Sequence, residues 1–388
     1  MLEHDGPPAG EHRVTPLELF FDLVFVFGLT EVTTFLADDP TWHGLCRALL
    51  LLGALWWSWA AYAWLTNTVD TDEDAVLGAI LVAMAAMFVA ALVVPTAFTS
   101  HGLLFGVAFL IVNLMHIALY ALAARDDPDL LAAVSRAGRA SLAGSALIIV
   151  AAFVPTDVRP VLWLAALVVG LFGPLLGDVG GWRLEPTHFV ERHSLIIIIA
   201  LGESLIAIGI GTRHTSLGAA VIIAALLGLA IATSFWVAYF DFFAIRFRQL
   251  LNEQHGAARI ALARDAYTYL HLPMVAGIVL SAFALREVVA HTGHDLATVP
   301  AFALCGGSAL YIASYAALRW RVTRSVRSGR LLASIVFTAL FPVALVVPAI
   351  AAVASVAATW IGLHAYEIIW WREARTRTRA HRTTAPSS

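Results

Sequence analysis

About twelve runs of predominantly apolar residues, separated by short polar or proline-containing turns, occupy almost the whole chain. A run of about 20 such residues is long enough to cross the hydrocarbon core of a bilayer as a helix. The chain of 388 residues is 60% hydrophobic and only 13% charged, and its mean hydropathy is +0.82. Soluble domains carry about 25% charged residues. The sequence therefore predicts an all-α polytopic membrane protein whose main partner is the lipid bilayer.

Hydrophobicity, turn residues and charges set the expected limits of the twelve spans. These limits are 17–36, 44–66, 75–99, 102–123, 139–155, 158–177, 188–212, 215–244, 265–290, 299–318, 331–347 and 349–371. The last two runs also read as one continuous element, but Pro342 and Pro348 favour a turn between them.

The distribution of arginines predicts the orientation of the chain in the membrane. All 24 basic residues are arginines. If the N-terminus is cytoplasmic, every arginine except Arg47, Arg159, Arg213 and Arg286 falls in a cytoplasmic segment. Positively charged residues accumulate on the cytoplasmic side of membrane proteins. We therefore expect both termini in the cytoplasm, with residues 1–16 as a polar tail that lacks the features of a signal peptide.

The chain also shows signs of an internal duplication. Three short matches occur in the same order, six spans apart: Glu31 with Glu203, 59–62 with 236–239, and 116–125 with 311–319. An even number of spans per unit makes the two units parallel. We predict a 6+6 pseudo-repeat with a first unit at 17–180, a second at 186–371, and a basic, disordered cytoplasmic tail at 372–388. In this arrangement the first and seventh spans face each other.

Three carboxylates interrupt the first span: Glu18, Asp22 and Glu31. A charge within a span costs at least ~2.5 kcal/mol on insertion scales, so such residues are paired or used. Because a helix rises ~1.5 Å and turns ~100° per residue, Asp22 lies ~6 Å deeper than Glu18 on the same face. Glu31 lies ~20 Å beyond Glu18, in the outer part of the membrane. The span therefore presents carboxylates at two depths.

The seventh span repeats this arrangement, with Glu191, Arg192 and His193 at its inner end and Glu203 well inside. Five further ionisable residues lie near the cytoplasmic ends of other spans: His116, Asp241, His271, His364 and Glu367. Carboxylates supply charge for a cation, and histidines titrate in the physiological range. The pattern predicts a pathway for a small ion or a proton, formed by Asp22, Glu31, Glu203, His116, Asp241, Glu18, Glu191 and His193.

A structural interpretation stands beside this one. Glu18, Glu191, Arg192, Glu367 and Asp241 can instead be interfacial residues that cap helices or form ion pairs with arginines. His116 and His271 can equally serve in packing hydrogen bonds. The aromatic cluster in 56–64 could form a cation-binding cage, although packing and anchoring at the interface are favoured.

Several kinds of chemistry find no support in the sequence. Two cysteines, Cys46 and Cys305, are too few for a disulfide framework or a four-cysteine metal site. His188 and His193 are five residues apart, whereas a metal-binding pair on one helical face needs a spacing of three or four. Nucleotide-binding motifs and the G-x-S-x-G elbow are missing from the sequence, and the arginines are explained by topology rather than by nucleic acid. We expect no catalytic residues, no metal and no cofactor.

Two long motifs, RVTPLELFFDLVFVFGLTEVTTFLADDPTW (13–42) and HFVERHSLIIIIALGESLIAIGIG (188–211), resemble the bacterial low temperature requirement A family. The segments WWSWAAYAW (56–64) and NTVDTDED (67–74) are also similar to that family. The resemblance covers about residues 12–372. It implies a multi-span protein of the bacterial inner membrane, named for growth in the cold, and it implies no mechanism.

The segment 20–27 is also similar to the first-helix signature F-S-D-x-V-F-x-I of the endolysosomal and bacterial potassium channels that lack a conventional selectivity filter. That resemblance implies two six-span repeats, a hydrophobic constriction on the first span, and Asp22 as a polar anchor behind the helix. Phe21 replaces the serine of the signature, and residues 191–195 do not match it. Three hypotheses remain: a proton- or cation-coupled secondary transporter, a cation channel, and a membrane-embedded enzyme or non-transporting partner protein.

Overall fold

The structure is a computed structural model that describes residues 14–69, 73–172, 181–213, 215–240, 244–324 and 328–383. Every regular element within these ranges is a helix. Ten of the described helices are long and apolar enough to cross a membrane, and two shorter apolar helices cover Arg159–Leu171 and Gly329–Ala344. The prediction of an all-α polytopic membrane protein is confirmed.

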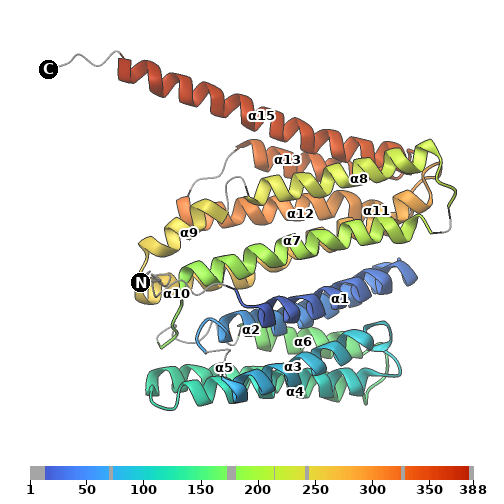
Figure 1. The fold of residues 1–388 in the computed structure, drawn as a ribbon. Coiled ribbons are helices and arrows are strands. Elements are labelled where there is room, and N and C mark those ends of the chain that lie inside the picture. The colour runs from blue at the N-terminus through green and yellow to red at the C-terminus, as the bar shows by residue number, and fades with distance from the viewer. Residues whose placement is uncertain are drawn as a thin grey trace, which may run out of the picture.

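The first part of the chain forms one group of helices, coloured blue to green in Figure 1. It consists of α1 (Pro16–Asp38), α2 (Trp42–Leu65), α3 (Asp74–Leu92), the short 3-10 helix η1 (Val94–Thr96), α4 (Gly102–Ala123), α5 (Pro128–Ala151) and α6 (Arg159–Phe172).

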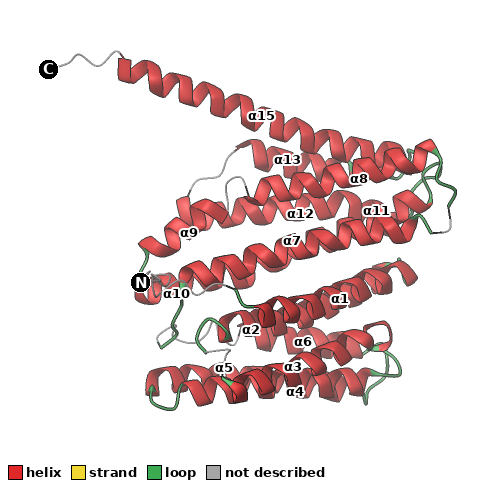
Figure 2. Ribbon diagram, in the orientation of Figure 1, coloured by secondary structure: helices red, strands yellow, loops and turns green. Residues whose placement is uncertain are grey.

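The second part lies beside the first and is coloured green to red in Figure 1. It consists of α7 (Pro186–Gly211), α8 (Ala219–Ala238), α9 (Ala244–Glu253), α10 (Gly256–Ala263), the π-helical segment η4 (Arg264–Tyr269), α11 (His271–Ala290), α12 (Thr298–Thr323), α13 (Ser328–Ala339), α14 (Phe341–Ala344) and α15 (Ala349–Thr383). Figure 2 shows that loops connect these helices at the two ends of the bundle.

Local sequence signals explain where the key helices begin. α1 starts with a capping box, in which the Thr15 side chain accepts from the Glu18 backbone and Glu18 accepts from the Thr15 backbone. α7 starts with Glu185, whose carboxylate accepts from the backbone N–H groups of Thr187 and His188. In both helices a proline, Pro16 or Pro186, follows the cap, where its missing N–H costs nothing.

Three predicted boundaries are wrong. α5 begins at Pro128 rather than near 139, because Asp127 caps it. Arg136 and Arg139 therefore lie on the helix, and both side chains are exposed. The segment predicted as a loop at 245–264 contains α9 and α10. α15 continues to Thr383, so residues 372–383 are helical rather than disordered; alanine and arginine, frequent there, are good helix formers.

α1 lies on the side of the first group that meets the second group. It packs against α2 and α3 within its own group and against α7 and α11 of the second group. Within the first group, α1 packs with α2 and α3, and α3–α4, α4–α5, α5–α6 and α2–α6 also pack together. Within the second group, the helices six predicted spans later repeat these six pairings: α7 with α8 and α11, and α11–α12, α12–α13, α13–α15 and α8–α15. The packing of α2 with α4 and that of α8 with α11 are not repeated to a similar extent in the other group.

Candidate functional site

A cluster of buried charged residues lies where α1 meets α7. Both helices begin at the same end of the bundle, here called the first end, and both finish at the opposite, second end (Figure 1). Glu18 and Asp22 are four residues apart on α1, and His188 and Arg192 are four apart on α7. Residues at this spacing share one face of a helix. The two pairs therefore face each other across the interface.

Arg192 is the centre of this cluster. Its side chain is fully buried, and its Nη1 donates to Glu18 Oε1 at 3.0 Å and to Thr66 Oγ1 at 2.9 Å. Its Nη2 donates to Asp22 Oδ1 at 2.6 Å. The indole N–H of Trp59, from α2, donates to the same Asp22 oxygen at 2.7 Å. One guanidinium thus holds two carboxylates from the neighbouring helix.

His188 completes the cluster in a defined tautomer. The side chain of Asn67 is oriented because its Oδ1 accepts from the Glu185 backbone N–H, while its Nδ2 donates to the Glu185 carbonyl. The same Nδ2 lies 3.1 Å from His188 Nδ1, which must therefore accept. The proton of the neutral imidazole is then on Nε2, which donates to Glu18 Oε2 at 3.1 Å.

The charges in this cluster do not balance. With Glu18 and Asp22 counted as ionised and His188 as the neutral Nε2–H tautomer, the single guanidinium of Arg192 leaves one surplus negative charge. Both carboxylates are at most 2% exposed. The second oxygen of Asp22, Oδ2, makes no hydrogen bond to any residue that the structure describes. A buried, uncompensated charge is costly, so this arrangement favours the uptake of one proton or one cation at Asp22.

Aromatic and imidazole rings continue from the cluster into α8 and α11. His193 is fully buried and packs against Trp59, Tyr267 and His271, with ring centroids 4.9 to 5.5 Å apart. Its Nδ1 donates to the Phe189 carbonyl at 2.9 Å. His271 donates from Nδ1 to the Ala266 carbonyl, so its Nε2 accepts from the Tyr239 hydroxyl at 3.0 Å. Both histidines therefore carry their proton on Nδ1.

A second carboxylate lies between α1 and α7 nearer the second end. Glu203 is 1% exposed, and its Oε2 accepts from the Thr30 hydroxyl at 2.5 Å. Thr33, almost one turn further along α1, donates to the Leu29 carbonyl at 3.0 Å, and the other oxygen of Glu203, Oε1, makes no hydrogen bond to any residue that the structure describes. Glu31 follows Thr30 and so points ~100° away around α1, where its side chain is half-buried. The two glutamates are neighbours, but Glu31 does not face Glu203 directly.

The other predicted site residues lie elsewhere. Glu191 is half-buried on α7. His116, on α4, lines a separate pocket between the two groups of helices. Glu367 forms a two-pronged ion pair with Arg330, at 2.6 and 3.0 Å, as the structural interpretation expected. Asp241 lies outside the described residues.

Sequence reasoning missed the central role of Arg192, which it assigned to the membrane interface. It also missed His188, Asn67 and Trp59 as partners of the two carboxylates. One signal was present: His188 and Arg192 have the same four-residue spacing as Glu18 and Asp22, at the same depth of two facing helices. Complementary charges at matched spacing predict ion pairs between helices.

The fold defines the class of this chain as a multi-pass, all-α membrane protein. The model of the family described as bacterial low temperature requirement A protein (LtrA) matches residues 13–365. An uncharacterized protein of Rhizobium meliloti (strain 1021) is 32% identical over 319 residues, which cover 76% of this chain and 74% of that protein. The chain therefore belongs to the bacterial low temperature requirement A family, as its motifs indicated.

Proposed function

We propose that this protein is a proton- or cation-coupled secondary transporter, and that its ions pass along the interface between α1 and α7. The observation that carries the proposal is the charge imbalance of the Glu18–Asp22–Arg192 cluster. A structural ion pair is balanced, whereas this cluster is one positive charge short, and Asp22 Oδ2 makes no hydrogen bond to a described residue. An intramembrane carboxylate in this condition is suited to bind and release a proton or a small cation.

Glu203 supports the same proposal as a second binding position on the same interface. On α7 it lies eleven residues beyond Arg192, and Thr30 on α1 lies eight residues beyond Asp22. The two positions are therefore separated by roughly 12–16 Å along the helices. Beyond His193, the buried residues between them are apolar, among them Phe25, Leu29, Ile196 and Ala200. An ion can pass this segment only if water enters or the helices move, because transfer of a bare charge into apolar surroundings is costly.

The predicted repeat and orientation belong to this proposal. The matching sets of helix contacts in the two groups support two parallel six-helix units, with α1 and α7 as equivalent first helices. The arginine distribution supports an inner-membrane protein with both termini in the cytoplasm. With this orientation the Asp22 cluster lies in the cytoplasmic half of the membrane and Glu203 in the outer half.

The test is ion flux in proteoliposomes that contain the purified full-length protein. A potential, negative inside, is imposed, and the entry of H⁺, Na⁺ or K⁺ is followed with indicator dyes. We expect flux above that of empty liposomes, a loss of at least about tenfold in Asp22→Asn, and a similar loss in the Glu31→Gln/Glu203→Gln double variant. A tenfold loss of flux corresponds to ~1.4 kcal/mol, which is less than the free-energy cost of removing a charged side chain that binds the ion.

Glu287→Gln is the matched control, because Glu287 is a partly buried glutamate near the C-terminal end of α11 whose charged neighbour is His291, four residues on. It should retain wild-type flux. Normal flux in Asp22→Asn and in the double variant would refute the site assignment, and wild-type protein that moves none of the three cations would refute the function.

The apolar segment between Asp22 and Glu203 favours a second candidate, a cation channel with a hydrophobic constriction. Single-channel recording separates the two. Steps above about 10⁶ ions per second are faster than a conformational cycle of microseconds to milliseconds allows. Such steps would identify a channel and eliminate the carrier.

A further inference from the structure

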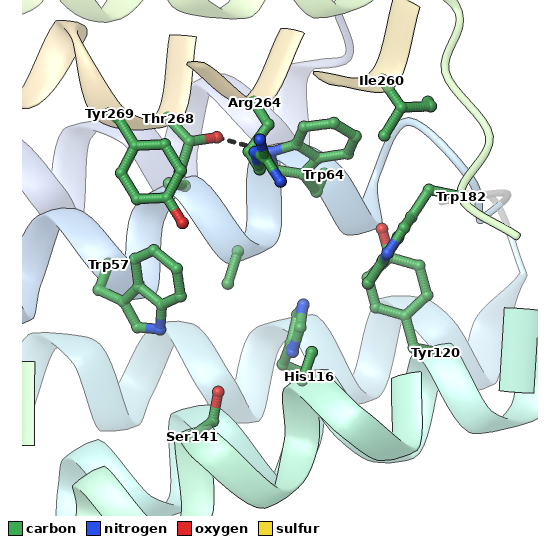
Figure 3. Close-up of a pocket in the computed structure, with 13 residues that line it drawn as sticks. Trp57, Trp64, His116, Tyr120, Ser141, Trp182, Ile260, Arg264, Thr268 and Tyr269 are labelled. Carbon is green, nitrogen blue, oxygen red and sulfur yellow. Dashed lines mark hydrogen bonds between the residues drawn. The ribbon is translucent and has the colours of Figure 1, made fainter. Parts of the chain in front are cut away.

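A separate pocket lies between the two groups of helices, near the first end (Figure 3). Its volume is about 90 Å³. Since about 10–15 Å³ of such volume holds one water, there is room for roughly six or more water-sized groups, the size of one aromatic ring with a substituent. The pocket shares no residue with the Asp22 cluster or with Glu203, so the inference drawn from it does not rest on the proposed transport.

The walls of the pocket are aromatic. Trp57, Trp64, Tyr120, Trp182 and Tyr269 surround it, from α2, α4, η4 and the segment before α7. Several rings fix one another edge to face: the centroids of Tyr120 and Trp182 are 5.3 Å apart, and those of Trp64 and Trp182 are 6.1 Å apart. Tyr269 is held by its hydroxyl, which donates to the Leu171 carbonyl at 2.6 Å. Rigid, preformed aromatic walls suit a flat apolar ring.

His116 and Ser141 add polar groups to this aromatic lining. His116 points into the pocket in Figure 3, and neither of its ring nitrogens makes a well-aligned hydrogen bond to a described residue, although the Ala61 carbonyl lies near. The Ser141 hydroxyl lies beside it in the lining. An imidazole whose two nitrogens are buried and lack a well-aligned protein partner is suited to bind a polar group of a ligand.

The charge at the pocket is positive. Arg264 lines it, and its Nε and Nη2 both donate to Asp265 Oδ1, at 3.0 and 2.8 Å, which leaves Nη1 outside that pair. The other oxygen of Asp265 accepts from Arg321 Nε at 2.8 Å. Two guanidinium groups therefore share one carboxylate, and the group of three carries a net charge of +1. This charge opposes a cation, although aromatic walls alone would attract one.

From these contacts we infer that the pocket binds a small lipophilic aromatic anion, with its ring between the tryptophans and its acidic group toward Arg264 and His116. The ring is recognised by stacking and burial, and the anion by the surplus positive charge. Lipophilic weak acids of this kind reach such a pocket through the membrane in their neutral form. The inferred ligand class is therefore a membrane-permeant aromatic carboxylate or phenolate.

Binding of three isosteric probes tests the inference: 4-ethylbenzoate, 4-ethylbenzyl alcohol and 4-ethylbenzylamine. Saturation-transfer NMR or equilibrium dialysis is performed on the full-length protein in nanodiscs of zwitterionic lipid, and empty nanodiscs give the partitioning background. We expect the anion to bind at least about tenfold more tightly than the alcohol, and the amine to bind most weakly. Equal binding of all three probes, or preference for the amine, would overturn the inference.

Two variants locate the binding. Ala137→Phe, from α5, fills the pocket without removing an aromatic wall or an ion pair, and should abolish saturable binding of the anion. Arg264→Gln should weaken the anion about tenfold and leave the alcohol within about twofold. Arg125→Gln is the matched control, because Arg125 is an exposed arginine at the end of α4 whose partner is the adjacent Asp126. Undiminished anion binding in Ala137→Phe would place the ligand elsewhere and refute the inference.

Discussion

Two buried arginines, Arg192 and Arg330, serve different purposes in this protein. Arg330 on α13 is 6% exposed, forms two hydrogen bonds with Glu367 of α15, and lies 3.8 Å from the centroid of the Tyr315 ring. That pair is balanced, one charge to one. Arg192 faces two carboxylates, and His188, whose tautomer Asn67 sets, contacts one of them through Nε2. The difference teaches that the charge count of a buried cluster, more than the presence of an ion pair, distinguishes a binding position from a purely structural contact.

The largest difference in stability between the two clusters is expected when the arginine of each is removed. Arg192→Met leaves Glu18 and Asp22 buried without a cation, and we expect a loss of about 3–5 kcal/mol in the free energy of unfolding. Arg330→Met should cost less, because the Glu367 side chain is 13% exposed and water can reach it. Chemical and thermal unfolding in detergent compare the two. A smaller loss in Arg192→Met than in Arg330→Met would break the comparison.

The corresponding pair replacements extend this experiment. A balanced buried pair can be replaced by apolar residues at little cost. Arg330→Met/Glu367→Leu should therefore recover most of the stability that Arg330→Met loses. Arg192→Met/Asp22→Leu should recover much less, because Glu18 remains.

Neutralisation of one carboxylate should have opposite effects in the two clusters. Asp22→Asn removes the surplus negative charge and keeps the amide within reach of Arg192 and Trp59, so stability should be unchanged or higher at neutral pH. Glu367→Gln unbalances the other pair and should cost about 1–3 kcal/mol. Unfolding measurements on both variants check this, and a loss in Asp22→Asn as large as that in Glu367→Gln would contradict the charge count. Asp22→Asn thus tests transport without loss of the fold.

The aromatic residues beside the two clusters, Trp59 and Tyr315, should contribute less to the stability of the protein than the charged residues do. Trp59→Phe removes the indole N–H that donates to Asp22 and should cost about 1–2 kcal/mol, since the carboxylate loses one of its two donors. Tyr315→Phe keeps the ring against Arg330 and should cost less. The midpoint of thermal unfolding, measured for both proteins in the same detergent, gives the order. A reversed order would show that Trp59 only fills space.

The smallest effect on stability is expected at the ion pair of Asp127 and Arg183, which is more exposed than the two buried clusters. This effect should depend on pH. Asp127 caps α5, and the Leu130 backbone N–H, together with Arg183, lowers the pKa of its carboxyl below the usual value. A lowered pKa in the folded state stabilises the protein above the unfolded pKa, near 4, and this stabilisation disappears as the pH falls through the folded pKa. Asp127→Ala should therefore unfold at a slightly lower temperature than wild type at pH 7. The difference should shrink below about pH 4, and a difference that grows there would contradict this account.

Most of the fold could be predicted from the sequence, because apolar runs of bilayer length have few alternatives. α4 has the predicted limits, and α1 and α7 differ from theirs by at most two residues. The errors at α5 and α15 arose where arginines lie on a helix, since charge was read as a loop signal. The carboxylates of the candidate site were found by their depth, but their partners were not, because Thr66 and Asn67 are ordinary polar residues at the end of α2.

The sequence by itself determined the class of protein, the family, most of the helical spans and the carboxylates that need a partner within the membrane. Hydrophobic periodicity and the cost of a charge in lipid are local properties, so a single sequence reveals them. Only the tertiary structure decided which charges meet. The rotation and height of α7 against α1 bring Arg192 to Asp22, Asn67 fixes the tautomer of His188, and the distance between the two groups of helices creates the aromatic pocket. Such contacts join residues more than a hundred positions apart, and packing alone determines them.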